Sequence, residues 1–391
     1  MKFESNGTGA KEVRLGIIGL GNMGTVHARS VMSGKVPRVW LAAVCDPRLP
    51  SGYGEAKPFT DPSALIRSGE VDAVLIATPH PSHMPIGIEA LGNGLHVLVE
   101  KPIAVQKSDC EKFIAAHRGR ERQVFAAMFN QRTDPFFQKI RALIKGGELG
   151  EIRRVSWTVT DWFRPAKYYA SGSWRATWAG EGGGLLLNQC PHNLDLLQWL
   201  FGMPTSVRAY CGFGRYHDIE VEDDVTAYLR FQNGATGVFI SSTGEAPGTN
   251  RLEIAAERGK IVHENDTLLF TRNEVEMSQF SKTAEGAFSA PPTWDVRFPM
   301  SGHGGYGEQH AGIMKNFANA ILDGEPLIAP ASEGIHSVEL ANAMIQSALT
   351  DKTVELPMNG KAYERRLKEL IAGSKGKRSI KPGLVRAKRG K

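Results

Sequence analysis

The sequence lacks any apolar run long enough to span a bilayer, any CxxC pair of cysteines and any internal repeat. A transmembrane helix needs about 20 mostly apolar residues, so an integral helical membrane protein is excluded. The four cysteines are scattered, which is typical of reduced thiols rather than of a disulfide framework. No group of His, Cys or Asp has the spacing of a metal site. The first eleven residues lack the apolar segment of a secretory signal, and we expect a cytoplasmic protein.

Basic charge is also lacking on most of the chain, although the net charge is +6. Residues 374–391 hold eight Lys and Arg and no acid, so the remainder carries a net charge of −2. A basic tail could bind nucleic acid or a membrane surface, but here no basic face extends it. We therefore expect neither partner, and we interpret the tail as a terminus that frays or embraces another subunit.

The length of 391 residues exceeds that of one ordinary domain and predicts two. In the first third, apolar runs of strand length alternate with helical patterns, which is typical of a parallel sheet with helices on both faces. Beyond residue 130, strand patterns follow one another over short turns, as in an antiparallel sheet. We predict an α/β protein with a Rossmann doubly wound domain over 1–130. An α+β domain with a large, mainly antiparallel open sheet follows over 131–372, and a basic tail over 373–391.

Apolar patterning also places the individual elements. In the first domain it predicts strands over 13–18, 39–44, 72–77, 96–99 and 124–128. It predicts helices over 23–32, 84–93 and 109–117, the last with Ser108 as its N-cap. In the second domain it predicts strands over 152–162, 207–211, 226–231, 236–240, 251–256 and 267–271. A helix over 135–145 opens that domain, two late helices over 309–322 and 332–349 close it, and 280–305 is predicted to be a polar loop.

Gly19, Gly21 and Gly24 form a G-x-G-x-x-G motif between the first predicted strand and its helix. The first glycine permits a tight turn, the second allows a pyrophosphate to approach the backbone, and the third allows close helix–strand packing. The N-terminus of the helix favours phosphate charge, so Asn22 and Met23 are expected to contact the cofactor as well. Without its strand–helix context the motif would be a weak signal.

An acid ends the second predicted strand, 22 residues after the last glycine of the motif. This residue, Asp46, has the spacing of a carboxylate that hydrogen-bonds a ribose 2′-hydroxyl, which favours NAD. Arg48 leaves NADP open as the less favoured alternative, because a nearby guanidinium could hold a 2′-phosphate.

Lys101 follows a buried apolar strand, and Glu100 and Pro102 flank it. In open α/β sheets ligands bind beyond the carboxyl ends of the strands, so Lys101 is expected at the cofactor cleft. A partly desolvated lysine there can donate a proton or stabilise charge. Glu100 is expected beside the cofactor. The alternative for Lys101 is a surface lysine at the end of a strand.

Other polar residues follow the neighbouring strands of the same predicted sheet. Thr78, His80 and His83 come after the third strand, and Asn130 after the last. We expect these four to contact the cofactor, with the alternative that the histidines merely cap the turn. Arg132 lies where cofactor and substrate should meet, and we expect it to bind substrate.

The second domain carries a glycine-flanked group of polar residues. Asn188, His192 and Asp195 fall at i, i+4 and i+7, which places them on one helical face. Pro191 should bend or restart the helix just before His192, and the glycines at 182–184 let another backbone or a ligand come close. His192 is either a catalytic group or a satisfied core histidine.

Aromatic residues interleaved with arginine lie between the two domains. Trp162 and Tyr168 suit stacking on a pyranose ring and hydrogen bonding to it, although an ordinary aromatic core would look alike. Trp174 and Arg175 could instead touch the nicotinamide end of the cofactor. His310 opens a late helix that could lean into the same cleft.

These motifs together resemble those of the Gfo/Idh/MocA oxidoreductases, the relatives of glucose–fructose oxidoreductase and inositol dehydrogenase. The resemblance covers roughly residues 13–358 and rests on the glycine motif, Glu100-Lys101-Pro102 and the glycines before His192. It implies hydride transfer between NAD(P) and a hydroxyl carbon of a sugar, inositol or related polyol. It also implies a homodimer or homotetramer formed through the open sheet of the second domain. By position, Lys101 matches the catalytic lysine of the family and His192 its catalytic histidine.

One residue departs from the family pattern. Many members carry Asp where this chain has Asn188. Asn is neutral and cannot raise the basicity of His192, but it can hydrogen-bond a substrate hydroxyl or orient the ring. Asp195 is either a substitute orienting residue or a structural acid.

The predicted reaction places His192 at the hydroxyl proton and Lys101 beside the developing alkoxide. Lys101, His192 and Asn188 are expected to bind substrate together with Arg132, Trp162 and Tyr168. The alternative is a glycoside-cleaving enzyme that keeps NAD bound and uses transient oxidation. A dinucleotide-sensing regulator is disfavoured, because it would need neither Lys101 nor His192.

Overall fold

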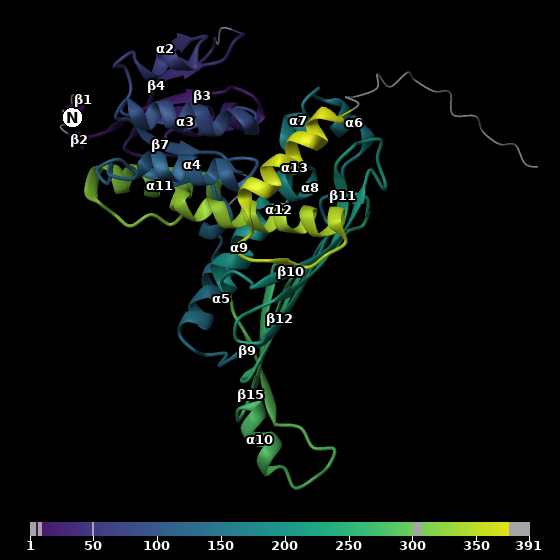
Figure 1. The fold of residues 1–391 in the computed structure, drawn as a ribbon. Coiled ribbons are helices and arrows are strands. Elements are labelled where there is room, and N and C mark those ends of the chain that lie inside the picture. The colour runs from purple at the N-terminus through teal and green to yellow at the C-terminus, as the bar shows by residue number, and fades with distance from the viewer. Residues whose placement is uncertain (1–4, 7–9, 49–50, 300–306, 375–391) are drawn as a thin grey trace, which may run out of the picture.

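A six-stranded parallel sheet forms the N-terminal domain of the computed structural model, which describes residues 5–6, 10–48, 51–299 and 307–374 (Figure 1). Its strand order is β5-β4-β3-β6-β7-β8, and every neighbouring pair is parallel. The strands are β3 (Val13–Ile18), β4 (Val39–Cys45), β5 (Lys57–Phe59), β6 (Ala73–Ile76), β7 (His96–Val99) and β8 (Phe125–Ala127). The helices between them are α1 (Asn22–Met32), α2 (Pro62–Ile66), α3 (His83–Gly92) and α4 (Lys107–His117). The predicted Rossmann architecture is confirmed.

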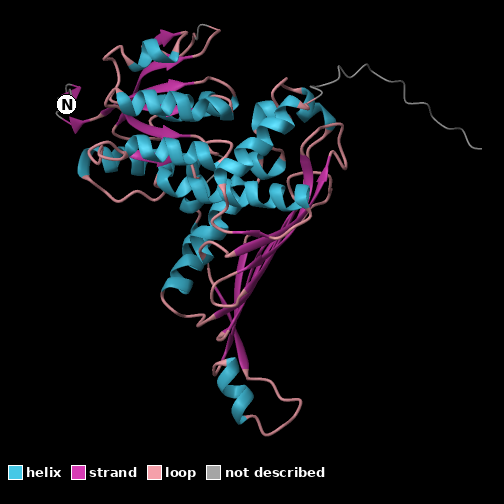
Figure 2. Cartoon of the chain, in the orientation of Figure 1, coloured by secondary structure: helices cyan, strands magenta, loops and turns pink. Residues whose placement is uncertain are grey.

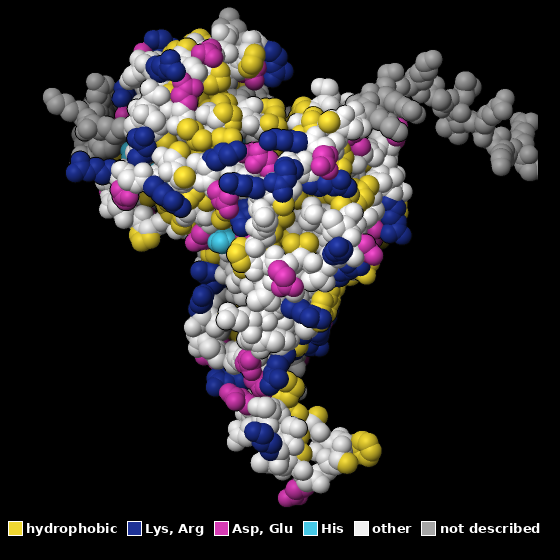
Figure 3. All heavy atoms as spheres, in the orientation of Figure 1, with side chains coloured by type: hydrophobic (Ala, Val, Ile, Leu, Met, Phe, Trp, Pro, Cys, Tyr) yellow, Lys and Arg dark blue, Asp and Glu magenta, His cyan; other side chains and the backbone are white. Residues whose placement is uncertain are grey.

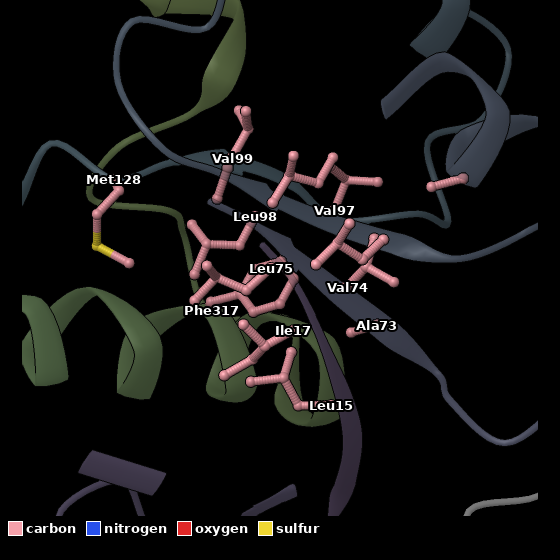
Figure 4. Close-up of a cluster of buried hydrophobic side chains, with 14 of the residues drawn as sticks. Leu15, Ile17, Ala73, Val74, Leu75, Val97, Leu98, Val99, Met128 and Phe317 are labelled. Atoms are coloured by element: carbon pink, nitrogen blue, oxygen red, sulfur yellow. The ribbon is translucent and has the colours of Figure 1, made fainter. Parts of the chain in front are cut away.

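The first core contains a helix from much later in the chain. In the close-up of Figure 4, Phe317 of α11 (Glu308–Asp323) lies against Ile17, Leu75 and Leu98 of the sheet. All of these side chains are buried, as expected for parallel strands covered on both faces. The predicted helix over 309–322 is therefore present, but it covers the first domain instead of closing the second. Its apolar stripe does not reveal which of two sheets it will cover.

A nine-stranded sheet forms the second domain, in the order β16-β15-β14-β13-β9-β12-β11-β10-β17. Its strands are β9 (Ile152–Val159), β10 (Ser206–Phe213), β11 (Glu222–Arg230), β12 (Thr236–Ser242), β13 (Asn250–Ala256), β14 (Gly259–Glu264), β15 (Thr267–Asn273), β16 (Thr293–Arg297) and β17 (Val354–Glu355). Only one neighbouring pair within this described sheet, β9 with β12, is parallel. The mainly antiparallel prediction is confirmed, although β9 is antiparallel only toward β13.

Helices cover one face of this sheet and meet the Rossmann domain, while the far end of the sheet extends away from them (Figures 1 and 2). The longer helices of the second domain are α5 (Pro135–Lys145), α9 (Pro191–Phe201), α12 (Gly334–Thr350) and α13 (Gly360–Ala372). Helix α5 has the predicted bounds, because Asp134 caps it by accepting from the N–H of Phe136 and Pro135 occupies its first turn. No described helix is long and apolar enough to cross a bilayer.

Several local predictions were wrong. Strands β14 and β16 and helix α13 were not predicted, and the predicted loop 280–305 includes β16 and the end of α10 (Met277–Thr283). Residues 300–305 of that loop and residues 375–391 of the basic tail lie outside the described residues. Helix α4 begins at Lys107, not after a Ser108 cap, because Asn342 of α12 accepts from the Lys107 N–H at 3.0 Å. A partner from another element thus replaces the local cap.

Acidic and basic side chains are intermingled over the face of the molecule shown in Figure 3. This distribution gives that face no field of a single sign.

A buried carboxylate supports the glycine turn at 182–184. Glu222 of β11 accepts from the N–H groups of Gly184 and Leu186 at 2.8 and 3.0 Å. Its second oxygen has no hydrogen-bond partner among the described residues. Burial raises the pKa of Glu222 to about 7, since the charged form loses its hydration.

Replacing this residue, Glu222→Gln, is expected to change how stability depends on pH. Between about pH 4.5 and 7 the folded state holds a proton here that the unfolded state has released, so the free energy of unfolding falls as the pH rises. Glutamine does not titrate and removes that decline. The difference in free energy of unfolding between the variant and wild type should therefore be about 2 kcal/mol more favourable to the variant at pH 8 than at pH 5. Urea unfolding at both pH values measures this. An equal pH dependence in both proteins would contradict it.

Candidate active site

The glycine motif lies between β3 and α1 and leaves one stretch of backbone open. Gly19 has φ +93°, and a Cβ atom there would lie 2.7 Å from the Ala77 oxygen. A Cβ atom on Gly24 would lie 1.8 Å from the Gly19 oxygen, whereas one on Gly21 would meet nothing within 4 Å. Gly19 and Gly24 are therefore required by packing, and Gly21 exposes backbone at the end of α1, which no side chain caps. This arrangement fits a bound pyrophosphate.

Asp46 lies beside this loop at the end of β4. It accepts from the Leu20 N–H at 3.1 Å and from the backbone and Nε of Arg48 at 3.1 and 3.0 Å. The hydrogen bond from the Arg48 side chain lowers the pKa of Asp46, which keeps it ionised. An ionised carboxylate here can accept from a ribose 2′-hydroxyl and repels a 2′-phosphate, so the residues fit NAD. Arg48 is occupied by Asp46 rather than held ready for a phosphate.

The histidines after β6 are buried. The two ring nitrogens of His83 lie 2.8 Å from the carbonyl oxygens of Pro102 and Thr78, so the ring lies between two strand-end turns and, when neutral, donates to one of these oxygens. The ring of His80 lies 5.8 Å from that of His83 and 6.0 Å from that of Trp174. Burial lowers the pKa of both histidines. His83 therefore hydrogen-bonds within the turns that follow two strands, and His80 is a neutral ring beside Trp174.

Glu100 lies beneath the end of β7, held by a histidine that the sequence did not single out. Its Oε1 lies 2.7 Å from Nε2 of His27 on α1, and its Oε2 accepts from the Lys101 N–H at 3.1 Å. Burial opposes ionisation, but the hydrogen bond from His27 and the charges of His27 and Lys101 outweigh it and lower the pKa of Glu100 to about 2. The ring of His310 lies 5.6 Å from that of His27. Lys101 therefore has a buried negative charge, that of Glu100, directly beside it.

Lys101 joins the two domains. Its Nζ donates to the backbone oxygen of Asn188, at 2.8 Å, across the domain boundary. Burial lowers the pKa of Lys101, and the charges of Glu100 and Glu181 oppose that shift. The lysine is therefore a desolvated cation aimed at the second domain, and the surface-lysine alternative does not describe it.

The polar group around His192 is built on two helices. Helix α8 (Leu185–Asn188) ends at Asn188, and α9 restarts at Pro191, as the proline predicted. Asn188 and His192 thus do not share one continuous helical face. Burial and the charge of Lys101 hold the pKa of His192 well below its usual range, so the ring is neutral. Its Nδ1 has no hydrogen-bond partner among the described residues.

Aromatic and polar side chains extend this group away from the Rossmann sheet. The hydroxyl of Tyr168 donates to Oδ1 of Asn188 at 3.2 Å and accepts from Arg175 and Gln189, each at 3.1 Å. The Arg175 guanidinium lies 4.7 Å from the Tyr168 ring and 4.4 Å from the Trp174 ring. The structure therefore brings Asn188, Tyr168, Trp174 and Arg175 together.

Trp162 is connected to this group through an arginine. Its link to the group is Arg164, whose guanidinium lies 5.2 Å from the Trp162 ring and 5.1 Å from the Tyr168 ring. Asn130 is buried and its side-chain NH₂ donates to Gln309 of α11 at 2.9 Å, while its Oδ1 has no hydrogen-bond partner among the described residues.

Arg132 and Asp195 form a buried ion pair where the two domains meet. Arg132 is 0% exposed and forms two hydrogen bonds with Asp195, at 2.7 and 2.6 Å. Its remaining nitrogen donates to the Ile328 oxygen and to Glu333. The guanidinium nitrogens of Arg132 are thus used within the protein, in contrast to the predicted substrate contact, and Asp195 contacts Arg132 as a structural acid would. Both side chains are buried where the domains meet, and a buried charge is stable only when it is paired with an opposite one.

Sequence reasoning missed three residues at the site: His27, Glu181 and Gln189. The available signals were weak. Glu181 directly precedes the three glycines, and His27 lies one helical turn beyond the glycine motif. Neither position indicates a contact until the tertiary structure brings distant segments together: His27 meets Glu100 within the first domain, and Glu181 meets Asn188 within the second.

Two features indicate the class of this protein. One domain carries a dinucleotide-binding loop, and its lysine contacts the segment of the other domain that carries His192. This combination is that of a two-domain, nicotinamide-dependent oxidoreductase. Comparison with protein families supports this class. The oxidoreductase family with the NAD-binding Rossmann fold, GFO/IDH/MocA, matches residues 13–128, and the GFO/IDH/MocA C-terminal domain matches residues 137–262. The chain belongs to the GFO/IDH/MocA family, and its cofactor is NAD.

Individual relatives align over almost their whole length. Inositol 2-dehydrogenase of Rhizobium meliloti is 26% identical, over 88% of this chain and 99% of the relative. Levoglucosan dehydrogenase of Pseudarthrobacter phenanthrenivorans is 25% identical, over 89% and 99%. Among solved structures, the WlbA dehydrogenase from Bordetella pertussis in complex with NADH and UDP-GlcNAcA is 25% identical with a TM-score of 0.72, and covers 89% of this chain and 100% of its own.

Proposed function

We propose that this protein transfers hydride between NAD and a secondary hydroxyl carbon of a sugar, glycoside or cyclic polyol, with Lys101 and His192 acting at the hydroxyl oxygen. The observation that carries the proposal is the contact from Lys101 Nζ to the Asn188 oxygen, which brings the lysine of one domain to the polar turn of the other. Relatives that act on inositol and levoglucosan support the substrate class.

The two residues divide the work at the substrate oxygen. NAD, when bound, accepts the hydride. His192 accepts the hydroxyl proton, since its lowered pKa keeps the ring neutral and basic groups must be unprotonated to act. Lys101 stabilises the negative charge that develops on the oxygen, and its desolvation strengthens that interaction. The Asn188 carbonyl holds the lysine in place.

The remaining polar groups suit a ring with many hydroxyls. Asn188, Tyr168, Gln189 and Arg175 form one hydrogen-bonded network of donors and acceptors. Trp174 presents an aromatic ring beside it, and aromatic faces pack well on the apolar faces of sugar rings. We assign substrate binding to this network, together with Lys101 and His192.

We also propose that the protein is a homo-oligomer formed through the sheet of its second domain. Tyr210 of β10 and Tyr228 of β11 are 62% and 42% exposed on adjacent strands. Large exposed aromatic side chains are enriched at interfaces between subunits.

A panel of substrates tests the proposed function. Purified protein is incubated with inositols, anhydrosugars, free aldoses and aryl glycosides, with NAD and NADP in parallel, and reduced nicotinamide is measured by absorbance. We expect net NADH with at least one cyclic polyol or sugar, and a kcat/KM at least about tenfold higher with NAD because Asp46 repels a 2′-phosphate. Release of the aryl group without net NADH would favour the glycoside-cleaving alternative. Turnover of none of these compounds would contradict both.

A further inference from the structure

A buried carboxylate touches the catalytic cluster from the turn before the three glycines. We propose that this residue, Glu181, is a positioning residue for the reaction: it fixes the orientation of the Asn188 side chain and supplies the negative charge that balances Lys101 and Arg175. This inference rests on the proposed function and deepens it, because it assigns a role to a residue outside the Lys101 and His192 pair.

Glu181 ends α7 (Trp178–Glu181) and is 2% exposed. One of its oxygens accepts from the Asn188 side-chain amide, and the other accepts from the Ala176 N–H at 2.5 Å. The Arg175 guanidinium lies 4.0 Å away. Both oxygens are thus used as acceptors, which favours the ionised carboxylate. Burial raises the pKa of Glu181, and the hydrogen bonds from Ala176 and Asn188 oppose that shift. A carboxylate buried so completely needs such partners, and here the partners are groups of the site.

The contact with Glu181 selects one of two orientations for the Asn188 amide. A carboxylate can only accept, so the NH₂ end of the amide must face Glu181. The oxygen end then faces the other way, where it accepts from Tyr168 at 3.2 Å and Gln189 at 3.1 Å. The opposite orientation would place the amide oxygen against the carboxylate and leave the Tyr168 hydroxyl facing a donor. Because the backbone oxygen of Asn188 holds Lys101, the same turn orients the lysine.

The charge of Glu181 completes the balance of the cluster. Lys101 and Arg175 are cations in a poorly hydrated region, and Glu100 is already hydrogen-bonded to His27. Glu181 is the second carboxylate whose charge acts on Lys101, and it raises the pKa of that lysine against the effect of burial. The titratable groups that face Lys101 or Glu181 come from both domains: His80, His83, Glu100, Arg175, Cys190, His192, Glu222 and His310.

The decisive variant is Glu181→Gln, which keeps the size of the side chain and removes its charge. A glutamine NH₂ group would face either the Ala176 N–H or the Asn188 NH₂, both of which are donors, so the hydrogen bonding that orients Asn188 weakens. We expect kcat to fall by about tenfold or more. We also expect the alkaline limb of the kcat/KM profile to move to lower pH by about one unit, because Lys101 loses its protonated form sooner. The Kd of NAD should not change, since Glu181 lies outside the glycine loop.

Two further variants keep the proposal open to contradiction. Glu181→Asp retains the charge but shortens the reach to Asn188, so kcat should fall while the alkaline limb stays in place. Glu222→Gln is the matched control, because it makes the same exchange at a second buried carboxylate beside the glycines, one that accepts from Gly184 and Leu186 and not from Asn188. Its alkaline limb should coincide with that of wild type.

The outcomes separate this inference from the proposed function. Wild-type kcat and an unmoved alkaline limb in Glu181→Gln would overturn the role of Glu181, even if Lys101 proves essential. An equal shift in Glu222→Gln would also overturn it, since the effect would then be general to buried carboxylates here. If Glu181→Gln does not fold, Glu181→Asp decides: an unchanged kcat there overturns the positioning role, and a lowered kcat with an unmoved limb supports it.

Discussion

Replacing Lys101 with methionine should lower kcat by about 10²- to 10⁴-fold and leave the affinity for NAD nearly unchanged. Methionine has a similar length and is apolar, so it fits the desolvated position that Lys101 occupies. It removes the charge that stabilises the substrate oxygen and the donor that binds the Asn188 oxygen. The glycine loop and Asp46, which are expected to hold the cofactor, do not contact this side chain.

Steady-state kinetics with a substrate found in the panel, and titration of the protein with NADH by fluorescence, measure the two effects. Lys112→Met is a suitable control, because Lys112 is an exposed lysine of α4 paired with Asp109. Wild-type turnover in Lys101→Met would exclude Lys101 from the reaction. If Lys101→Met loses both NADH binding and turnover, Lys101 is a cofactor contact instead of a catalytic residue.

The second large effect is expected from the buried pair of Arg132 and Asp195. Replacing Asp195 with alanine leaves a guanidinium with 0% exposure, whose remaining hydrogen-bond partners among the described residues are Glu333 and the Ile328 oxygen. Breaking one side of a buried pair typically costs about 3–5 kcal/mol. We expect Asp195→Ala to lower the free energy of unfolding by about 3 kcal/mol, because Glu333 still offsets part of the charge.

Urea unfolding followed by circular dichroism measures this loss, and the double variant Arg132→Met/Asp195→Leu should recover most of it, since two apolar side chains restore a neutral interior. The kcat of folded Asp195→Ala should stay near that of wild type. A stable Asp195→Ala with strongly reduced kcat would place Asp195 in the catalytic machinery, contrary to its observed contacts.

Features set by neighbours in the sequence were predictable. The glycine motif needs only a strand before it and a helix after it, and helix α5 carries its own cap and proline. Likewise, Pro191 restarted a helix because it lacks an N–H wherever it lies. These predictions depend on chemistry within a few residues, so no knowledge of the tertiary structure was needed.

Features set by distant partners were not predictable. Arg132 looked like a substrate contact, because its position after the last Rossmann strand is known from sequence and its partner 63 residues later is not. Glu181 looked like an ordinary turn residue until Asn188, Lys101 and Arg175 were brought around it. Whether a charge is buried depends on tertiary contacts between segments that are distant in the sequence, and the local pattern of a single sequence does not indicate those contacts.

The packing of α11 against the first sheet also separates the order of synthesis from the order of folding. Residues 13–129 supply most of that core, but Phe317 and its neighbours fill part of the space against Ile17, Leu75 and Leu98. A nascent chain that has left the ribosome only as far as residue 130 would therefore expose an apolar patch that the finished protein covers. The dinucleotide half would wait, incompletely packed, until nearly 200 further residues have been translated, and its completion would join both halves into one cooperative unit.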